Sequence, residues 1–310
     1  MRLIIIVFAV TEYLYTHSLV FPGKYLKVGV VEDDKNRKEL APLLRFFSSK
    51  SGEEYTKLDD YVENMPEGQK NIYYVTGEGR EKAAMNPVVE KLAAKGYDVL
   101  FATEPLDEIM MESLRSYKEK DIVDAAKENL KLDDEDEEAK KKNEQLNEDF
   151  KDVREYLQTL LKGKIQKVQV TDLLQDSPAA LVQGAYGMSP TMQRYMRAQA
   201  VATGQDESSL GAMNQAVLEI NPNHPIVKDL NRMVKEDKES TELKNSAFLM
   251  YDVASMTSGY TVDDMKSFAK RVMSLMNDQV QVEEPPAAED EPEVKDAEVV
   301  AEVVDEEKED

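Results

Sequence analysis

Two short apolar segments separated by a helical pattern constrain the fold of this chain most. Residues 71–76 (NIYYVT) are rich in β-branched and aromatic side chains, which favour a strand. Residues 97–103 (YDVLFAT) are apolar enough for a strand buried on both faces. Between them, Asn86 can cap a helix that opens with Pro87. Strand, helix and strand in this order predict two parallel strands joined by a right-handed crossover.

A second helix is expected directly after this unit. Glu104-Pro105 breaks the second strand, and apolar residues then recur at helical spacing. These residues are Ile109, Met110, Leu114 and Tyr117. The first part of the chain is therefore predicted to be a small αβα layer.

The second part of the chain predicts an α+β unit that is mostly helical. A charged run over residues 133–142 leads into an apolar helical stripe at Leu146, Phe150, Val153, Leu157 and Leu161. Alternation over residues 164–170 then favours an antiparallel strand with one solvated face, and residues 180–183 a second short strand. Four helices follow, over residues 190–202, 225–235, 241–257 and 262–277.

Charge and composition exclude several kinds of site. The net charge of −23 argues against nucleic-acid binding, since a phosphate backbone requires clusters of Lys and Arg. There is no cysteine for a disulfide or thiolate site, and only His17 and His224 are present, too few for histidine-based metal or triad chemistry. No apolar run is long enough to span a bilayer.

The two ends of the chain differ from its middle. The start, MRLIIIVFAV, is similar to a signal peptide but lacks a cleavage site, so a buried strand or a misassigned start of the reading frame remains an alternative. Residues 283–310 hold fourteen acids and two lysines, which predicts a disordered acidic tail.

Local motifs give little support for catalysis. Gly77 and Gly79 follow a strand as in a dinucleotide site, but Lys82 stands where the third glycine is needed, so a simple turn is preferred. The acid pairs Asp59-Asp60 and Asp107-Glu108 are interpreted as solvated surface rather than catalytic carboxylates. His224, in a run of turn-forming residues, is expected to pack or to cap a helix.

A methionine stripe marks the helix that starts near residue 190. Ser189 can cap it and Pro190 can open it, and Met188, Met192, Tyr195 and Met196 fall on one side. Gln193, Arg194 and Arg197 lie on the opposite side. Burial in the core is the default for such a stripe, but methionine is also frequent where one surface must fit many partners.

The last two helices are amphipathic and must cover their apolar faces. Leu243, Ala247, Met250 and Ala254 line the first, and Phe268, Val272, Leu275 and Met276 line the second. These faces can pack on their own domain or against the same pair of a second subunit in a twofold bundle, and periodicity leaves both open.

Several stretches together resemble the heat shock protein 90 chaperones. KVGVVEDD from Lys27, LLRFFSS from Leu43 and LDDYVENM from Leu58 are similar to the family's middle domain. The same holds for GQKNIYYVTG from Gly68 and VLFATEPLDE from Val99. LEINPNHPI from Leu218 and SGY from Ser258 resemble its carboxy-terminal dimerisation domain.

The resemblance implies a division of the chain into four parts. It runs from Gly23 to Asn277, and residues 1–22 are expected to be a leader outside the family, disordered or artefactual. Residues 23–132 are then the end of the middle domain, 133–278 the dimerisation domain and 279–310 the tail. The nucleotide-binding domain of the family would lie upstream, so the chain is expected to be a fragment without catalytic, cofactor or metal residues, although the full-length family uses ATP and Mg²⁺.

Family membership also implies roles for the two apolar helix faces. A helix beside the cleft between the subunits touches clients in these chaperones, which assigns client binding to Met188, Met192, Tyr195 and Met196. The usual tryptophan is absent from Tyr186-Gly187-Met188. The implied dimer interface consists of Leu243, Ala247, Met250, Tyr251, Ala254, Phe268, Val272, Leu275 and Met276.

The expected partners are a second copy, partly folded clients and cochaperones, with neither nucleic acid nor membrane. Cytosolic and reticulum address motifs are absent from Glu307-Lys-Glu-Asp, which favours an organelle, the plastid first and then the mitochondrion, with the cytoplasm as an alternative. Two other functions remain open: a purely structural dimerisation module, and an enzyme that binds a small molecule at the strand–helix–strand layer.

Overall fold

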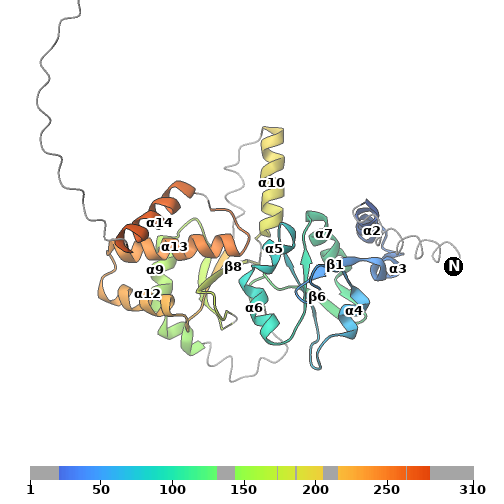
Figure 1. The fold of residues 1–310 in the computed structure, drawn as a ribbon, viewed down its shortest axis with the longest axis horizontal. Helices are drawn as coiled ribbons and strands as arrows, with labels where there is room; N and C mark the ends of the chain where they lie inside the picture. Colours follow the sequence, from blue (N-terminus) through green and yellow to red (C-terminus); the bar gives the residue numbers. More distant parts are fainter. Residues whose placement is uncertain are drawn as a thin grey trace, which may run out of the picture.

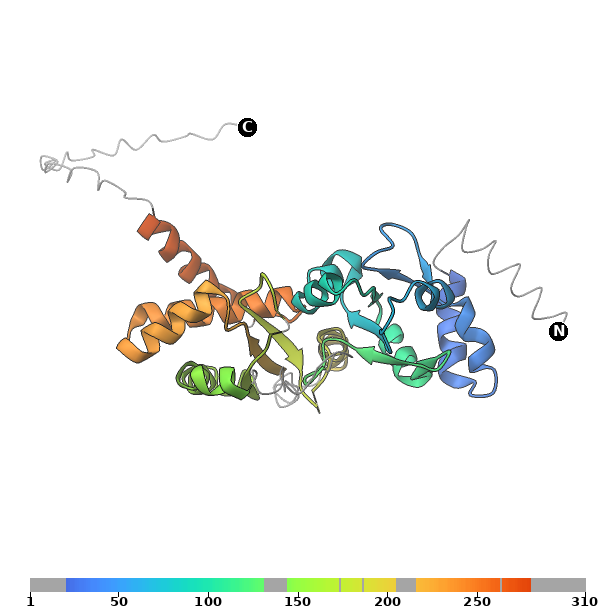
Figure 2. The same ribbon diagram turned by 90° about the horizontal axis from the view of Figure 1, so that it is seen from below.

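The fold was described from a computed structural model of the chain, for residues 21–130, 144–172, 174–185, 187–204, 216–262 and 264–279. These residues form two lobes that lie side by side, each built on its own sheet (Figures 1 and 2). Helix α10 (Pro190–Thr203) projects from the region between the lobes. The domain boundary predicted between residues 132 and 133, the residues before Phe21 and the acidic tail lie outside the described residues.

The first lobe contains a six-stranded sheet in the order β2-β1-β4-β3-β6-β5. Its central strands are β3 (Ile72–Thr76) and β4 (Val99–Ala102), which pair in parallel as predicted, with Tyr74 opposite Leu100. The others are β1 (Arg45–Ser48), β2 (Thr56–Lys57), β5 (Ser116–Tyr117) and β6 (Lys120–Asp124).

Helices cover both faces of this sheet, which confirms the predicted αβα layer. Successive strand residues point to opposite faces, so Tyr74 and Leu100 join one core, and Tyr73 and Val99 another. The first core includes residues of α2 (Phe21–Glu32), α4 (Leu58–Glu63) and α7 (Pro105–Leu114). The second includes residues of α5 (Gly79–Ala84) and α6 (Pro87–Ala94). Between α2 and β1 lie the short helix α3 (Arg37–Leu40) and a 3-10 turn (Ala41–Leu43).

Helix α7 begins where predicted but ends earlier. Glu104 and Asp107 form a reciprocal capping box at its start, and Leu114 is its last residue. Arg115 then takes a positive φ of 59°, and Tyr117 lies in a hairpin strand instead of the helix. Lys118 and Glu119 also have positive φ, which suits a two-residue turn between β5 and β6.

The second lobe contains a three-stranded sheet in the order β7-β9-β8. Its strands are β7 (Lys167–Val170), β8 (Ala179–Gln183) and β9 (Ala216–Ile220), of which β9 was not predicted from the sequence. Strand β7 pairs in parallel with β9, so the antiparallel prediction was wrong. Alternation in β7 correctly showed one buried face, but it carries no information on the direction of the neighbouring strand.

Helices of the second lobe start and end close to the predicted positions. They are α9 (Lys151–Leu160), α12 (Pro225–Glu236), α13 (Thr241–Thr257) and α14 (Met265–Gln279). The stripe expected as one helix is interrupted by a turn at Phe150, after a helical segment at residues 144–149. Val153 and Leu157 of α9 pack with Leu218 of β9 and Leu230 of α12 in one core.

The two lobes share apolar contacts and polar anchors. Val182 and Val217 of the second sheet belong to the same buried cluster as Leu92 of α6. The Glu90 carboxylate accepts from Ser177 Oγ at 3.0 Å, and the Glu128 carboxylate accepts from the Ala185 amide at 2.7 Å. The lobes therefore meet through a partly apolar contact with directional hydrogen bonds.

Asp124, at the end of β6, is buried, and burial raises its pKa from 3.8 to about 7. A carboxyl whose pKa is raised in the folded state costs stability as the pH rises from about 4 to about 7, and the full cost remains above that range. Its Oδ1 accepts from the Ala126 amide at 2.9 Å, a contact that asparagine can keep.

We therefore expect Asp124→Asn to raise the free energy of unfolding at pH 8 by about 2 kcal/mol, because the variant no longer buries a charge there. The gain should disappear near pH 4, and urea unfolding at both pH values measures it. Asp121→Asn, at an exposed position on the same strand, is the control and should change stability little. An equal gain at both pH values would contradict a charge-burial cost at Asp124.

Candidate functional site

Helix α10 carries the predicted client-binding residues Met192, Tyr195 and Met196, whereas Met188 lies just before its cap and outside the helix. The helix is formed by strong local signals. The Ser189 hydroxyl accepts from the Met192 amide at 3.0 Å, Pro190 occupies the first turn, and Gly204 ends the helix with a φ of 68°. Both the cap and the opening proline were predicted. The helix is therefore fixed at its two ends by its own sequence.

The polar side of α10 holds the helix to the second lobe. Arg194 donates from Nη1 to the Gly259 carbonyl at 2.6 Å, and Arg197 donates from Nη1 to Thr261 Oγ1 at 3.0 Å. Both acceptors lie in the segment between α13 and α14. Cationic side chains thus attach the helix to the protein, whereas in most surface helices the apolar face does so.

The apolar side of α10 is consequently left partly open. Met188, Met192 and Met196 are half-buried, and the Tyr195 side chain is 53% exposed. Only Pro190, Thr191 and Ala200 of this helix are buried. The methionine stripe is therefore not buried in the core, although burial was the default expectation.

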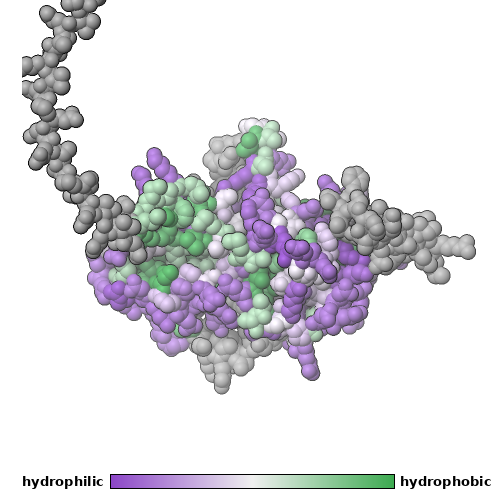
Figure 3. Space-filling model, viewed as in Figure 1, coloured by the Kyte–Doolittle hydropathy of each residue, from purple (hydrophilic) through white to green (hydrophobic). Residues whose placement is uncertain are grey.

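Helix α10 also carries an exposed apolar residue on another side. Val201, near the outer end of α10, is 63% exposed, and Figure 3 shows apolar side chains at the tip of the projecting helix. At about 100° per residue, Val201 lies about 180° around the helix from Met192, on the side of Arg194 and Arg197. Tyr195 and the three methionines are called the α10 surface below.

The predicted dimer residues on α13 have another role. Leu243, Ala247, Met250, Tyr251 and Ala254 are buried in the core of this chain, together with residues of β8, β9 and α12. Each is at most 6% exposed, so they present little area to a second subunit, and the expected dimer contact is not proposed for this helix face. The physical reason is that the three-stranded sheet needs an apolar cover, and α13 packs on β8.

The predicted dimer residues on α14 are placed differently. Phe268 and Val272 are half-buried, whereas Leu275 and Met276 are exposed, as are Met265 and Met273. Figure 3 shows apolar side chains gathered over α13 and α14, and Figure 2 shows α14 extending at the edge of the lobe. Met265, Met273, Leu275 and Met276 are called the α14 surface below.

A shallow apolar hollow of about 310 Å³ adjoins the α14 surface. It is lined by side chains of α12, α13 and α14, among them Ile226, Met233, Leu249, Val253 and Leu275. Exposed apolar side chains around a hollow are a common mark of a protein-binding surface.

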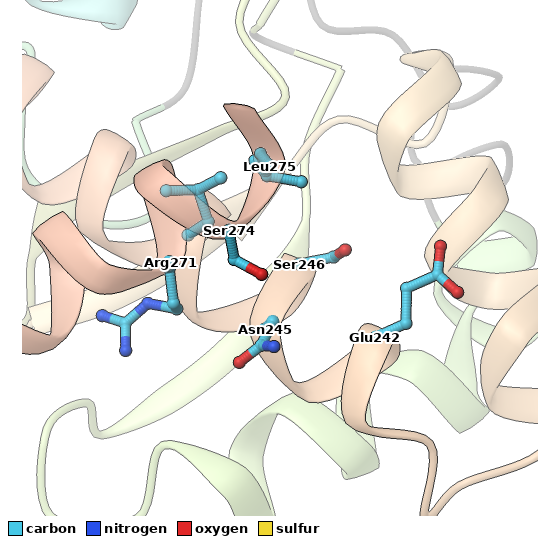
Figure 4. Close-up of a pocket in the computed structure, with 7 residues that line it drawn as sticks. Glu242, Asn245, Ser246, Arg271, Ser274 and Leu275 are labelled. Atoms are coloured by element: carbon cyan, nitrogen blue, oxygen red, sulfur yellow. The ribbon is translucent and has the colours of Figure 1, made fainter. Parts of the chain in front are cut away.

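A second hollow of about 250 Å³ lies between α13 and α14 and is more polar. Figure 4 shows Glu242, Asn245 and Ser246 of α13 facing Arg271, Ser274 and Leu275 of α14.

A buried ion pair anchors α14 on α13. Arg271 pairs with Asp252, and its guanidinium lies 5.3 Å from the centre of the Phe248 ring. Both charged side chains are largely buried, so each depends on the other for compensation. The pair fixes where α14 leaves the lobe, and hence the direction of the α14 surface.

The glycine turn after β3 has a packing role. A Cβ atom on Gly77 would lie 2.7 Å from Cα of Ala83, so this residue lets α5 pack against the strand end. Gly79 has a φ of 81°, which glycine adopts without strain. The interpretation as a simple turn agrees with this geometry.

The acid pairs differ from their expected exposure. Asp107 and Glu108 are buried, so their interpretation as solvated surface was wrong. Asp107 binds Lys27 Nζ at 2.5 Å and also caps α7, while Glu108 accepts from Ser189 Oγ at 2.5 Å. Asp59 is half-buried and accepts from the Tyr117 hydroxyl at 2.6 Å. Each of these three has a protein partner that explains its position.

His224 caps α12 as predicted, with Nδ1 accepting from the Ile226 amide at 3.2 Å. Within the described ranges, no three acidic or histidine side chains gather in a way that could hold a metal ion. None of the helices in the same ranges combines the length and the hydrophobicity needed to cross a bilayer.

Comparisons with known proteins add a family assignment to this geometry. A scan against protein-family models matches "Hsp90 protein" over residues 13–309, which extends beyond the resemblance noted for residues 23–277. The chain is 44% identical over 255 residues to heat shock protein 90-5, chloroplastic, of Arabidopsis thaliana, covering 82% of this chain and 32% of that protein. It is 40% identical over 256 residues to the mitochondrial heat shock protein 90-6 of the same plant, covering 82% and 31%.

Two further relatives come from other organisms. An endoplasmin homolog of Caenorhabditis elegans is 38% identical over 283 residues, covering 91% of this chain and 37% of that protein. Among solved structures, the middle domain of a Plasmodium falciparum heat shock protein is 50% identical and covers 33% of this chain and 43% of that one, with a TM-score of 0.33. The chain spans about a third of the length of the curated relatives it matches.

Proposed function

This chain belongs to the Hsp90 family, and we propose that it binds partly folded proteins through the α10 surface and self-associates through the α14 surface. The main observation in favour of client binding is that the polar side of α10 attaches the helix to the protein, while its apolar side is partly open. Its arginines hold the helix to the second lobe, while Tyr195 on the apolar side stays exposed.

The chemistry of the α10 surface suits many weakly bound partners. Methionine side chains adapt to different shapes, and Tyr195 adds a large apolar area with a polar end. Burial of about 100 Å² of apolar surface contributes roughly 2–3 kcal/mol before ordering costs. Such contacts hold a client reversibly, which a chaperone requires.

The proposal assigns no catalytic step to the described residues. ATP hydrolysis and cochaperone binding are proposed for the whole protein only, on the basis of family membership. A plastid location is proposed because a relative called chloroplastic is 44% identical, slightly above the 40% of a mitochondrial one. Immunodetection in purified plastids and mitochondria tests that location, and signal confined to mitochondria would refute it.

Client binding is tested by Met192→Gln combined with Met196→Gln. Glutamine keeps the length and helix propensity of methionine but makes the surface polar. We expect the double variant to lose most of its ability to suppress aggregation of a heat-unfolded test protein, measured by light scattering. Its circular dichroism and its mass by light scattering should be unchanged.

Met85→Gln is the matched control, because Met85 is an exposed methionine of the first lobe, 61% accessible and distant from α10 along the chain. It should suppress aggregation like the unmodified chain. Full suppression by the double α10 variant would refute client binding at this helix and would favour a purely structural dimerisation module.

A further inference from the structure

The hydrogen bond between Glu108 and Ser189 connects the two lobes at the base of α10. Glu108 lies in the first turn of α7, Ser189 is the cap of α10, and both side chains are buried. Ser189 Oγ donates to the Glu108 carboxylate at 2.5 Å and accepts from the Met192 amide at 3.0 Å. One hydroxyl therefore caps α10 and ties it to the first lobe.

Helix α10 is attached to both lobes by separate contacts. Its start is held by Glu108 of the first lobe, and its flank is held by Arg194 on Gly259 of the second lobe. Few other residues of α10 are buried, so these polar contacts contribute much of what fixes its direction. A rotation of one lobe against the other must therefore break one attachment or turn the helix.

The first turn of α7 also contacts α2, on another side of the helix. Asp107, the neighbour of Glu108, binds Lys27 of α2 at 2.5 Å, and α2 packs along α7. Adjacent residues of a helix point about 100° apart, so one turn of α7 can contact α2 through Asp107 and α10 through Glu108. A short, rigid helix turn thus joins the first described helix to the α10 surface.

The charged residues near Glu108 do not take the place of its hydrogen bond with Ser189. Lys127 lowers the pKa of Glu108 electrostatically, but Lys127 itself pairs with Glu112. Burial raises the pKa of Glu108, and the Ser189 hydroxyl opposes that rise. The carboxylate depends on Ser189 for its main hydrogen bond.

We infer that Glu108 is a positioning residue that sets the direction of the client-binding helix and couples it to the first lobe. This inference deepens the proposed function, because it concerns the same surface. The role is conformational: Glu108 lies at the base of α10 and acts through Ser189.

The sequence makes a direct test practical, because it contains no cysteine. Met85→Cys in the first lobe and Gln199→Cys on α10 place two spin labels at exposed positions. Electron–electron double resonance then measures the distance distribution between the lobe and the helix. With the labelled chain diluted in an excess of unlabelled chain, so that a dimer carries at most one labelled chain, the unmodified background should give one narrow distribution.

Glu108→Ala in this labelled background should broaden and shift the distance distribution, because the start of α10 loses its hydrogen bond to the first lobe. Glu108→Gln keeps an acceptor oxygen for the Ser189 hydroxyl and should restore the narrow distribution. Ser189→Ala breaks the same bond from the other side and should resemble Glu108→Ala, which covers the case that one variant folds poorly. An unchanged distribution in Glu108→Ala or Ser189→Ala would overturn the inference.

Glu90→Ala is the matched control, because Glu90 is another junction carboxylate but bonds Ser177 instead of α10. It should leave the lobe-to-helix distance unchanged, and the same broadening as in Glu108→Ala would show a general loosening of the junction and overturn the inference. Aggregation suppression keeps the two proposals apart. If the α10 methionine variants suppress normally while Glu108→Ala still shifts the distance, client binding fails and the positioning role stands.

Discussion

Replacement of Gly77 by alanine is expected to destabilise the first lobe by about 3 kcal/mol or more. The added Cβ would lie 2.7 Å from both Cα and Cβ of Ala83 and 2.8 Å from its amide nitrogen. Ala83 is fully buried in the core formed by α5, α6 and the sheet, so its backbone cannot move aside cheaply. Urea unfolding followed by circular dichroism measures the change.

Gly29→Ala provides a comparison within the same lobe. Gly29 lies inside α2, where a Cβ would meet only the end of the Leu40 side chain at 3.1 Å. A flexible side chain can shift, and alanine favours a helix over glycine by about 1 kcal/mol. This variant should be close to neutral or slightly stabilising. A similar small effect for Gly77→Ala would show that α5 can move and would refute the packing role of Gly77.

Introduction of two charges into the α14 surface, by Leu275→Glu with Met276→Glu, is expected to convert a dimer into a monomer. A charge buried at an apolar interface costs several kcal/mol, and about 3 kcal/mol corresponds to a more than 100-fold rise in Kd. Both side chains are exposed in the single chain, so its own fold should tolerate the change. Sedimentation velocity at micromolar concentration measures the mass, and circular dichroism checks the fold.

The control for this variant is Met85→Glu with Ile109→Glu, which adds the same charge at exposed apolar positions of the first lobe. It should remain dimeric. If the unmodified chain is itself monomeric at these concentrations, or if the α14 variant keeps the dimer mass, self-association through α14 is refuted. Because the α13 residues are buried in the chain's own core, their substitution would test folding and not association.

Local chemistry made many elements predictable from the sequence. The parallel pair β3 and β4, the caps at Ser189 and His224, and the positions of the last helices followed from residue patterns. In these cases the deciding contacts lie within a few residues along the chain, or within one apolar run. The resemblance to the heat shock protein 90 chaperones also came from sequence stretches, and the comparisons confirmed the family.

Other features depended on contacts between distant segments. The direction of β7 is decided by β9, about 50 residues later, and the burial of Glu108 by Ser189, 81 residues away. A pair of acidic residues looks the same in a sequence whether its side chains face solvent or a hydroxyl group from a distant segment. Periodicity shows which residues share a face of a helix or strand, but not what lies opposite that face.

The two apolar helix faces show this division most clearly. The sequence by itself determined that Met192, Tyr195 and Met196 share one side of α10, and that Leu243 and Ala247 share one side of α13. Only the tertiary structure decided that α13 covers the sheet with its apolar side, while α10 is held by its arginines and leaves its apolar side partly open. The physical reason is that burial depends on which surfaces are near enough to cover a face. Here α13 packs on β8 of the three-stranded sheet, whereas α10 projects from the region between the lobes and contacts α7 of the first lobe (Figure 1).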